Sequence, residues 1–124
     1  MNTITLKPEI SELYTLTEFI TKEMGEENFQ VNLIVEETFV NIVNYSKTES
    51  VTVNAECKDN ILTMEFIDNG IEFNPLLKEK PAVPNTIDEA EVGGLGILLT
   101  KEIADELDYH YENGENHLKI IKNV

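Results

Sequence analysis

The sequence predicts an α+β fold, a two-layer sandwich in which helices cover one face of a largely antiparallel mixed sheet. Two observations lead to this fold class. Apolar residues recur at helical spacing over about 10–24 and 29–45, whereas four later segments have strand character and are joined in pairs by short turns. The length of 124 residues and the hydrophobic fraction of 41% fit one domain, 1–124, with a single core.

The first elements are a short strand over residues 3–6 and a helix that follows Pro8. Proline suits the first turn of a helix, and Gly25 is suited to ending it. The apolar positions between them have helical spacing and are Ile10, Leu13, Leu16 or Thr17, Ile20 and Met24.

The second helix, about residues 29–45, is apolar nearly all round, which predicts that it is buried. A narrow polar stripe interrupts the apolar surface and consists of Gln30, Glu37, Asn41 and Asn44. Glu37 and Asn41 lie one turn apart on the same face. The amide oxygen can ligate Mg²⁺, and the carboxylate can accept a proton if burial raises its pKa. The alternative is an ordinary solvated helix face.

A hairpin follows, with strands over 51–58 and 61–68 and a turn at residues 59–60. Alternation places Asp68 on the same face as Leu62, Met64 and Phe66, at the end of the space between sheet and helices. A carboxylate there requires hydrogen-bond donors, and the exocyclic amino group of a ligand base would serve. The alternative is that Asp-Asn-Gly at 68–70 is only a turn.

Residues 71–92 contain three prolines and are expected to be a lid, a binding loop or a disordered segment. Gly93, Gly94 and Gly96 then precede a third helix, predicted over about 95–107. Unpaired N–H groups at a helix start attract anions, so this turn is either a phosphate cradle or a tight turn. A closing hairpin over 108–122, with a turn at 113–114, completes the chain.

The composition disfavours several classes of partner. The formal net charge is −15, and all nine basic residues are lysines, so nucleic acid and anionic membrane surfaces are not expected to bind. The acidity serves solubility or favours a basic protein partner. The chain has no apolar run long enough to span a membrane and no basic, apolar leader, and a single Cys57 forms no internal disulfide, so a cytoplasmic location is expected.

Three motifs in a fixed order resemble the GHKL ATPase superfamily: "EETFVN" at 36–41, "DNGIEFNP" at 68–75 and "GGLGILLTKEIADELDY" at 93–109. The short chain, the FNP after Asp-Asn-Gly and the GGLGI form are most similar to the anti-sigma factor serine/threonine kinase branch. The resemblance extends from about residue 5 to residue 122 and implies the Bergerat-type sandwich.

The resemblance implies roles for individual residues. Asn41 matches the asparagine that binds Mg²⁺, Glu37 the general base, and Asp68 the aspartate that binds the adenine amino group. Residues 71–92 correspond to the ATP lid, and the glycine turn to the phosphate contact. The implied ATP-binding set is Asn41, Asn44, Asp68, Gly70, Gly93, Gly94, Leu95, Gly96 and Lys101.

The sequence departs from the family pattern at three points. Glu72 stands where many relatives have a glycine, and Asn116 or His117 falls where many have a threonine that supports the adenine aspartate. The absence of arginine removes a common phosphate or partner clamp. Lys101 is the nearest basic candidate, or equally a solvated helix lysine.

The implied function is that of an Mg·ATP-dependent serine/threonine protein kinase. By resemblance, its substrate is an anti-anti-sigma (STAS-type) protein, its other partner is a sigma factor whose transcription it controls, and it forms a homodimer. The alternatives are a nucleotide-gated module that sequesters a partner without catalysis, a detached histidine-kinase catalytic domain, and a purely structural domain. His110 and His117 lack a convincing ligand set, so no zinc is expected.

Overall fold

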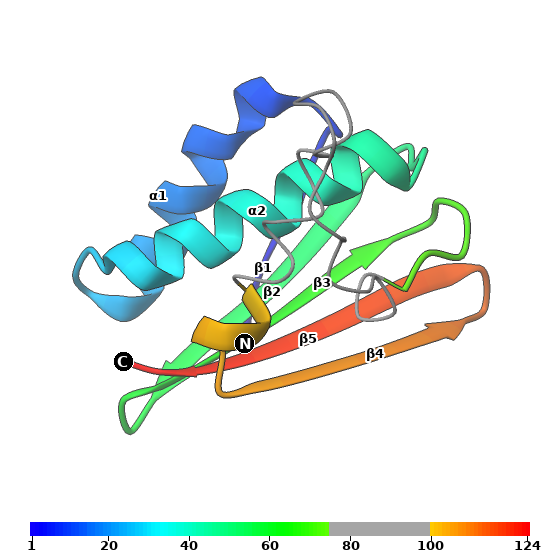
Figure 1. Ribbon diagram of the computed structural model, residues 1–124. Helices are drawn as coiled ribbons and strands as arrows, with labels where there is room; N and C mark the ends of the chain where they lie inside the picture. Colours follow the sequence, from blue (N-terminus) through cyan, green and yellow to red (C-terminus); the bar gives the residue numbers. More distant parts are fainter. Residues whose placement is uncertain (75–99) are drawn as a thin grey trace, which may run out of the picture.

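The computed structural model describes residues 1–74 and 100–124. Within these residues, five antiparallel strands form one sheet in the order β1-β2-β3-β5-β4, and the helices α1 and α2 cover one of its faces (Figure 1). The strands are β1 (Asn2–Leu6), β2 (Val51–Lys58), β3 (Ile61–Asp68), β4 (Glu106–Glu112) and β5 (Glu115–Asn123). The predicted two-layer α+β fold is confirmed, and every pairing described is antiparallel.

Both predicted N-terminal helices are present. A 3₁₀ turn (η1, Ile10–Glu12) leads into α1 (Leu13–Met24), which ends at Gly25 with a left-handed φ of 81°. The helix α2 (Phe29–Tyr45) begins at Asn28, whose side chain accepts a hydrogen bond from the N–H of Val31 at 3.1 Å.

The core lies between α2 and the inner face of the sheet. Strand alternation directs Val51, Val53 and Ala55 of β2 toward the helices, and the register of β3 places its buried residues beside them. Both residues of each two-residue hairpin turn have positive φ, with 54° at Asp59 and 63° at Asn60 in the first. Such turns match the twist of the strands that they join.

The prediction of a third helix over 95–107 is wrong at its C-terminal end. Residues 100–103 are helical, but β4 begins at Glu106, two residues before the strand expected there. Leu107 lies opposite Ile120 in the β4–β5 ladder and packs against the core, and the N–H of Asp105 donates to the carbonyl of Ile121 at 2.9 Å. The ladder therefore overrides the helical spacing of these residues. Residues 95–99 lie outside the described residues.

Among the described residues, none of the helices combines the length with the apolar character that crossing a membrane requires.

Candidate functional site

A cleft opens between α2 and the end of the sheet where β3 stops. The space between its walls is about 290 Å³, part of it open to solvent. Its walls combine apolar and polar side chains from α2, three strands and the segment after β3. The lining residues are Thr38, Asn41, Ile42, Phe66, Asp68, Phe73, Tyr109, Asn116 and Leu118.

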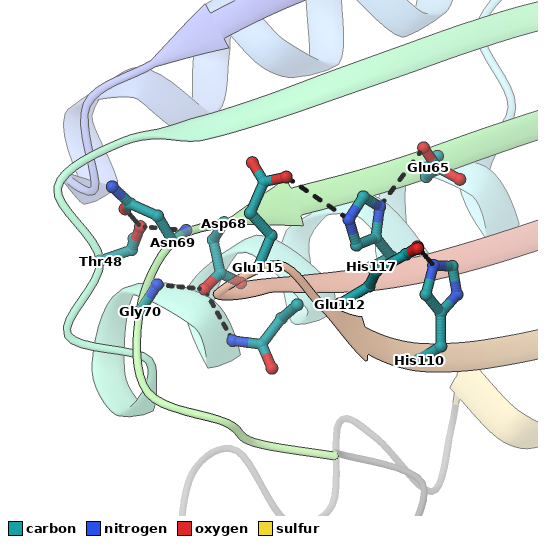
Figure 2. Close-up of polar contacts among 10 residues, drawn as sticks. Thr48, Glu65, Asp68, Asn69, Gly70, His110, Glu112, Glu115 and His117 are labelled. Carbon is teal, nitrogen blue, oxygen red and sulfur yellow. Dashed lines mark hydrogen bonds and ion pairs between the residues drawn. The ribbon is translucent and has the colours of Figure 1, made fainter.

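Asp68 lies at the end of β3 with its side chain in this cleft, as its strand parity predicts. Oδ1 accepts a hydrogen bond from the N–H of Gly70 at 3.0 Å (Figure 2). It also accepts from Nδ2 of Asn116 at 3.0 Å and from the hydroxyl of Ser46. Among the described residues, no donor reaches Oδ2. The carboxylate is thus fixed through one oxygen, and the other can accept from a ligand.

Asn116 is the residue of the closing hairpin that supports Asp68. Its Nδ2 also donates to the carbonyl of Ile71 at 2.8 Å, and its Oδ1 accepts from the N–H of Phe73 at 3.0 Å and from the hydroxyl of Tyr109. Both amide hydrogens and both lone pairs of Oδ1 are therefore engaged. The side chain joins the end of β3, β4 and the segment that follows β3.

His117, the other candidate for this supporting role, points to the opposite face of the sheet because neighbouring strand residues alternate. Figure 2 shows its ring between Glu65 and Glu115, whose carboxylates lie 3.8 and 3.7 Å from the two ring nitrogens. It stacks on His110 with 4.6 Å between ring centroids. Among the described residues, no group of three or more His, Cys, Asp or Glu side chains could hold a metal ion.

The polar stripe of α2 divides between the cleft and the solvent. Asn41 is 2% exposed and lines the cleft, whereas Gln30 and Asn44 are exposed. Oδ1 of Asn41 has no hydrogen-bond partner within the described residues. A buried, unpartnered amide oxygen is a suitable ligand for a hard cation, so this residue fits Mg²⁺ binding. Glu37 is half-buried, and burial together with the negative charge of Glu36 raises its pKa.

The turn after Asp68 is both a structural turn and part of the site. A Cβ atom on Gly70 would lie 2.0 Å from the carbonyl oxygen and from the hydroxyl oxygen of Ser46, so only glycine fits. Thr48 holds the same turn: its hydroxyl donates to Oδ1 of Asn69 at 2.6 Å and accepts from the N–H of Asn69 at 3.1 Å (Figure 2).

Three further residues belong to the site and are not among those predicted from the sequence: Thr38, Ser46 and Tyr109. A signal existed for Thr38, because it lies three residues before Asn41 and therefore on the same helix face. Strand parity within the closing hairpin places Tyr109 on the cleft side with Leu107. Burial raises the pKa of Tyr109, and the negative charges of Glu72 and Asp68 raise it further. A hydrogen bond with the backbone of Phe73 lowers it in part.

The predicted phosphate turn lies outside the part of the chain that the structure describes. Gly93, Gly94, Leu95 and Gly96 lie outside the described residues, as does the predicted lid from residue 75 to residue 92. Lys101 is described and is half-buried in the short helical segment at 100–103, and Glu72 is exposed.

Comparison with known proteins identifies the class of fold and then the family. The chain resembles the solved structure of the Acinetobacter baumannii histidine kinase AdeS, with a TM-score of 0.54 and 11% identity over 99% of this chain and 68% of that one. The histidine kinase domain of the blue-light activated kinase from Erythrobacter litoralis EL346 gives 0.50 and 12%, covering 92% of this chain and 60% of that one. These likenesses show the fold.

Residues 12–122 match the model of the histidine kinase-like ATPase domain, and the chain belongs to that family. It is also 25% identical over 96 residues to "Serine/threonine-protein kinase BtrW" of Bordetella bronchiseptica, a match that covers 74% of this chain and 68% of that protein. Membership in the family implies that the chain binds ATP through a kinase-like ATPase domain.

Proposed function

We propose that this chain is an Mg·ATP-dependent serine/threonine protein kinase of the anti-sigma type, acting on an anti-anti-sigma (STAS-type) protein and binding a sigma factor. The observation that carries the proposal is Asp68, a buried carboxylate held through Oδ1 by three donors, with Oδ2 directed to no donor of the described residues. Similarity to a relative named as a serine/threonine-protein kinase supports the reaction class.

In this proposal the cleft binds the adenine of ATP. The exocyclic amino group of the base donates to Oδ2 of Asp68, and Ile42, Phe66 and Leu118 provide apolar contacts for the ring. Because Asp68 is buried, water is excluded, and the hydrogen bond between its carboxylate and the base is stronger than the same bond would be in water. Asn116 and Gly70 act indirectly, because they fix the carboxylate that meets the base.

The phosphates are proposed to extend from the cleft toward the N-terminal half of α2 and the glycine turn. The Oδ1 atom of Asn41 would hold Mg²⁺, which neutralises phosphate charge in phosphoryl transfer. Glu37 would accept the proton of the substrate serine or threonine hydroxyl, a role that its raised pKa suits. Gly93, Gly94, Leu95, Gly96, Asn44 and Lys101 complete the proposed nucleotide contacts.

Nucleotide binding is tested by isothermal titration of the chain with Mg·ATP. We expect binding by wild type and a marked loss in Asp68→Asn, with unchanged affinity in Asp108→Asn, a control carboxylate on the exposed side of β4. No binding by wild type would refute the nucleotide site. Equal affinity in Asp68→Asn would refute the adenine contact alone.

Phosphotransfer is tested with radiolabelled ATP and a cognate STAS-type protein. We expect transfer by wild type, loss in Glu37→Gln and retention in Glu36→Gln, which removes the neighbouring carboxylate of the same helix. Full activity in Glu37→Gln would remove Glu37 from the role of base. Sedimentation of the same samples tests the proposed homodimer.

A second candidate function is nucleotide-gated sequestration of a partner without catalysis. The absence of arginine favours it, since arginine is a side chain that stabilises transferring phosphate, and the exposed Glu72 adds a negative charge after β3. Tight ATP binding together with partner capture, and without phosphate transfer to the captured partner, would support this function over the kinase.

A further inference from the structure

Thr38 is a buried threonine with an unused hydroxyl at the wall of the cleft. Its side chain is 1% exposed, and Oγ1 has no hydrogen-bond partner within the described residues. A threonine inside a helix usually satisfies its hydroxyl on the carbonyl of the preceding turn. In α2 this bond is not made, although Thr38 lies in the middle of the helix.

In the absence of a ligand, the buried hydroxyl of Thr38 lowers the stability of the folded chain. A buried polar group without a partner destabilises the folded chain, whereas valine has nearly the same shape and no such cost. The packing of α2 against the sheet therefore does not require threonine at this position. The hydroxyl is explained if a group that enters the cleft hydrogen-bonds to it.

The other polar groups of the cleft show which hydrogen-bond donors and acceptors remain available to a ligand. Within the described part of the chain, the three hydrogen bonds to Asp68 all reach Oδ1, which leaves Oδ2 as an acceptor, and Oδ1 of Asn41 is a second acceptor without a partner. The hydroxyl of Tyr109 and both amide hydrogens of Asn116 are engaged within the protein. The hydroxyl of Thr38 is thus a donor that remains for the ligand, in the same cleft as the acceptor carboxylate of Asp68.

We propose that Thr38 is a specificity-determining residue of this cleft: its hydroxyl donates to the adenine ring nitrogen next to the exocyclic amino group, while Asp68 accepts from that amino group. The inference rests on the proposed nucleotide function. Adenine presents a donor, its amino group, next to an acceptor, a ring nitrogen. The carboxylate of Asp68 and the hydroxyl of Thr38 complement these two groups. Guanine and hypoxanthine carry a carbonyl in place of the amino group. This carbonyl would face the carboxylate of Asp68, and two acceptors cannot hydrogen-bond to each other, so these bases should be disfavoured.

The test measures binding of ATP, 1-deaza-ATP and 7-deaza-ATP by titration to wild type, Thr38→Val and Thr38→Ser. 1-deaza-ATP lacks the ring nitrogen bonded to the amino-bearing carbon, and 7-deaza-ATP lacks the five-membered-ring nitrogen on the other side of the amino group. We expect Thr38→Val to bind ATP about 3- to 10-fold more weakly, the range for one neutral hydrogen bond, and Thr38→Ser to stay near wild type. Thr63→Val, on the opposite face of the sheet, is the matched control.

The two analogues test the hydrogen bond between the hydroxyl of Thr38 and the adenine ring nitrogen. One of the two should bind wild type more weakly than ATP by a similar factor, and Thr38→Val should bind that analogue and ATP equally. Unchanged ATP affinity in Thr38→Val, or an analogue penalty that persists in full in this variant, would overturn the inference. A wild type that binds no ATP would instead refute the proposed function, so the two failures are distinguishable.

Unfolding without nucleotide separates ligand recognition from a structural role. Because the hydroxyl has no hydrogen-bond partner in residues 1–74 and 100–124, Thr38→Val should unfold at the same or a higher temperature than wild type. A weaker ATP complex in a chain that is not destabilised supports the inference. A lower unfolding temperature would mean that the hydroxyl is used within the protein, which contradicts it.

Discussion

The side-chain amide of Asn116 donates to Oδ1 of Asp68 at 3.0 Å, while its carbonyl oxygen accepts from the N–H of Phe73 at 3.0 Å. One buried amide therefore orients the carboxylate at the end of β3 and also holds the chain that continues from it. This link makes the geometry of the base cleft dependent on the segment that leads toward residues 75–99.

Replacement of Asn116 should weaken ATP binding through Asp68. Asn116→Ala removes one of three donors to a buried carboxylate, and hydrogen bonds to charged groups are worth roughly 1.5–3 kcal/mol, so we expect about a tenfold or greater loss of affinity by titration. Asn116→Thr supplies a hydroxyl donor and should recover part of the loss. Equal affinity in Asn116→Ala would show that Ser46 and Gly70 alone fix the carboxylate.

Gly70→Ala should destabilise the fold because of a steric clash. The new Cβ would lie 2.0 Å from two oxygen atoms of Ser46, one of them in the backbone, so the turn must move, at a cost of about 1–3 kcal/mol. The control Gly25→Ala meets no atom within 4 Å, and its cost of roughly 1 kcal/mol comes from the left-handed φ of 81°. Urea unfolding of both variants measures the difference, and a smaller effect at Gly70 would contradict the clash.

Much of this architecture follows from local pattern. The two-residue turns at 59–60 and 113–114 and the alternation beside them predict the hairpins, and the parity of β3 places Asp68 in the cleft. The third helix fails at 104–107 because the antiparallel pairing with β5, which places Leu107 opposite Ile120, outweighs the helical spacing of these residues.

The supporting groups of the site could not be predicted in the same way. Ser46 and Asn116 reach Asp68 from 22 and 48 residues away in the sequence, and neither contact has a local periodic signal. The resemblance narrows the supporting residue to Asn116 or His117, and strand parity in the structure selects Asn116.

Glu37 should give opposite pH effects on stability and on catalysis. Its folded-state pKa is raised by burial and by Glu36, so ionisation is harder in the folded chain, and stability falls as the pH rises from the unfolded pKa through the folded one. Glu37→Gln should therefore be at least as stable as wild type at pH 7, with the difference vanishing below the unfolded pKa. Thermal unfolding across pH tests this, and a variant less stable at pH 7 would contradict it.

The catalytic effect of the same group has the other sign. If Glu37 is the base, phosphotransfer by wild type should rise with pH through the raised pKa, because only the carboxylate accepts the proton. Glu36→Gln removes a neighbouring negative charge and should shift this rise to lower pH. Single-turnover rates across pH give both profiles, and coincident profiles for wild type and Glu36→Gln would argue against Glu37 as the titrating group.

The hydroxyl of Tyr109 should affect nucleotide binding only through Asn116. This hydroxyl donates to Oδ1 of Asn116, and burial raises its pKa further above the neutral range, in which tyrosine is already protonated. Tyr109→Phe leaves that oxygen with the N–H of Phe73 as its donor, so we expect a loss of about 1 kcal/mol in unfolding free energy and a few-fold weaker ATP binding. The control Tyr111→Phe alters an exposed ring, 41% accessible, and should change neither.

A double-mutant cycle distinguishes this indirect role from a direct contact with the ligand. In the Asn116→Ala background the hydroxyl of Tyr109 has lost its acceptor, so the further change Tyr109→Phe should cost little additional ATP affinity. If the two losses in binding free energy simply add, Tyr109 contacts the nucleotide independently and the route through Asn116 is wrong. Titrations of wild type, the two single variants and the double variant complete the cycle.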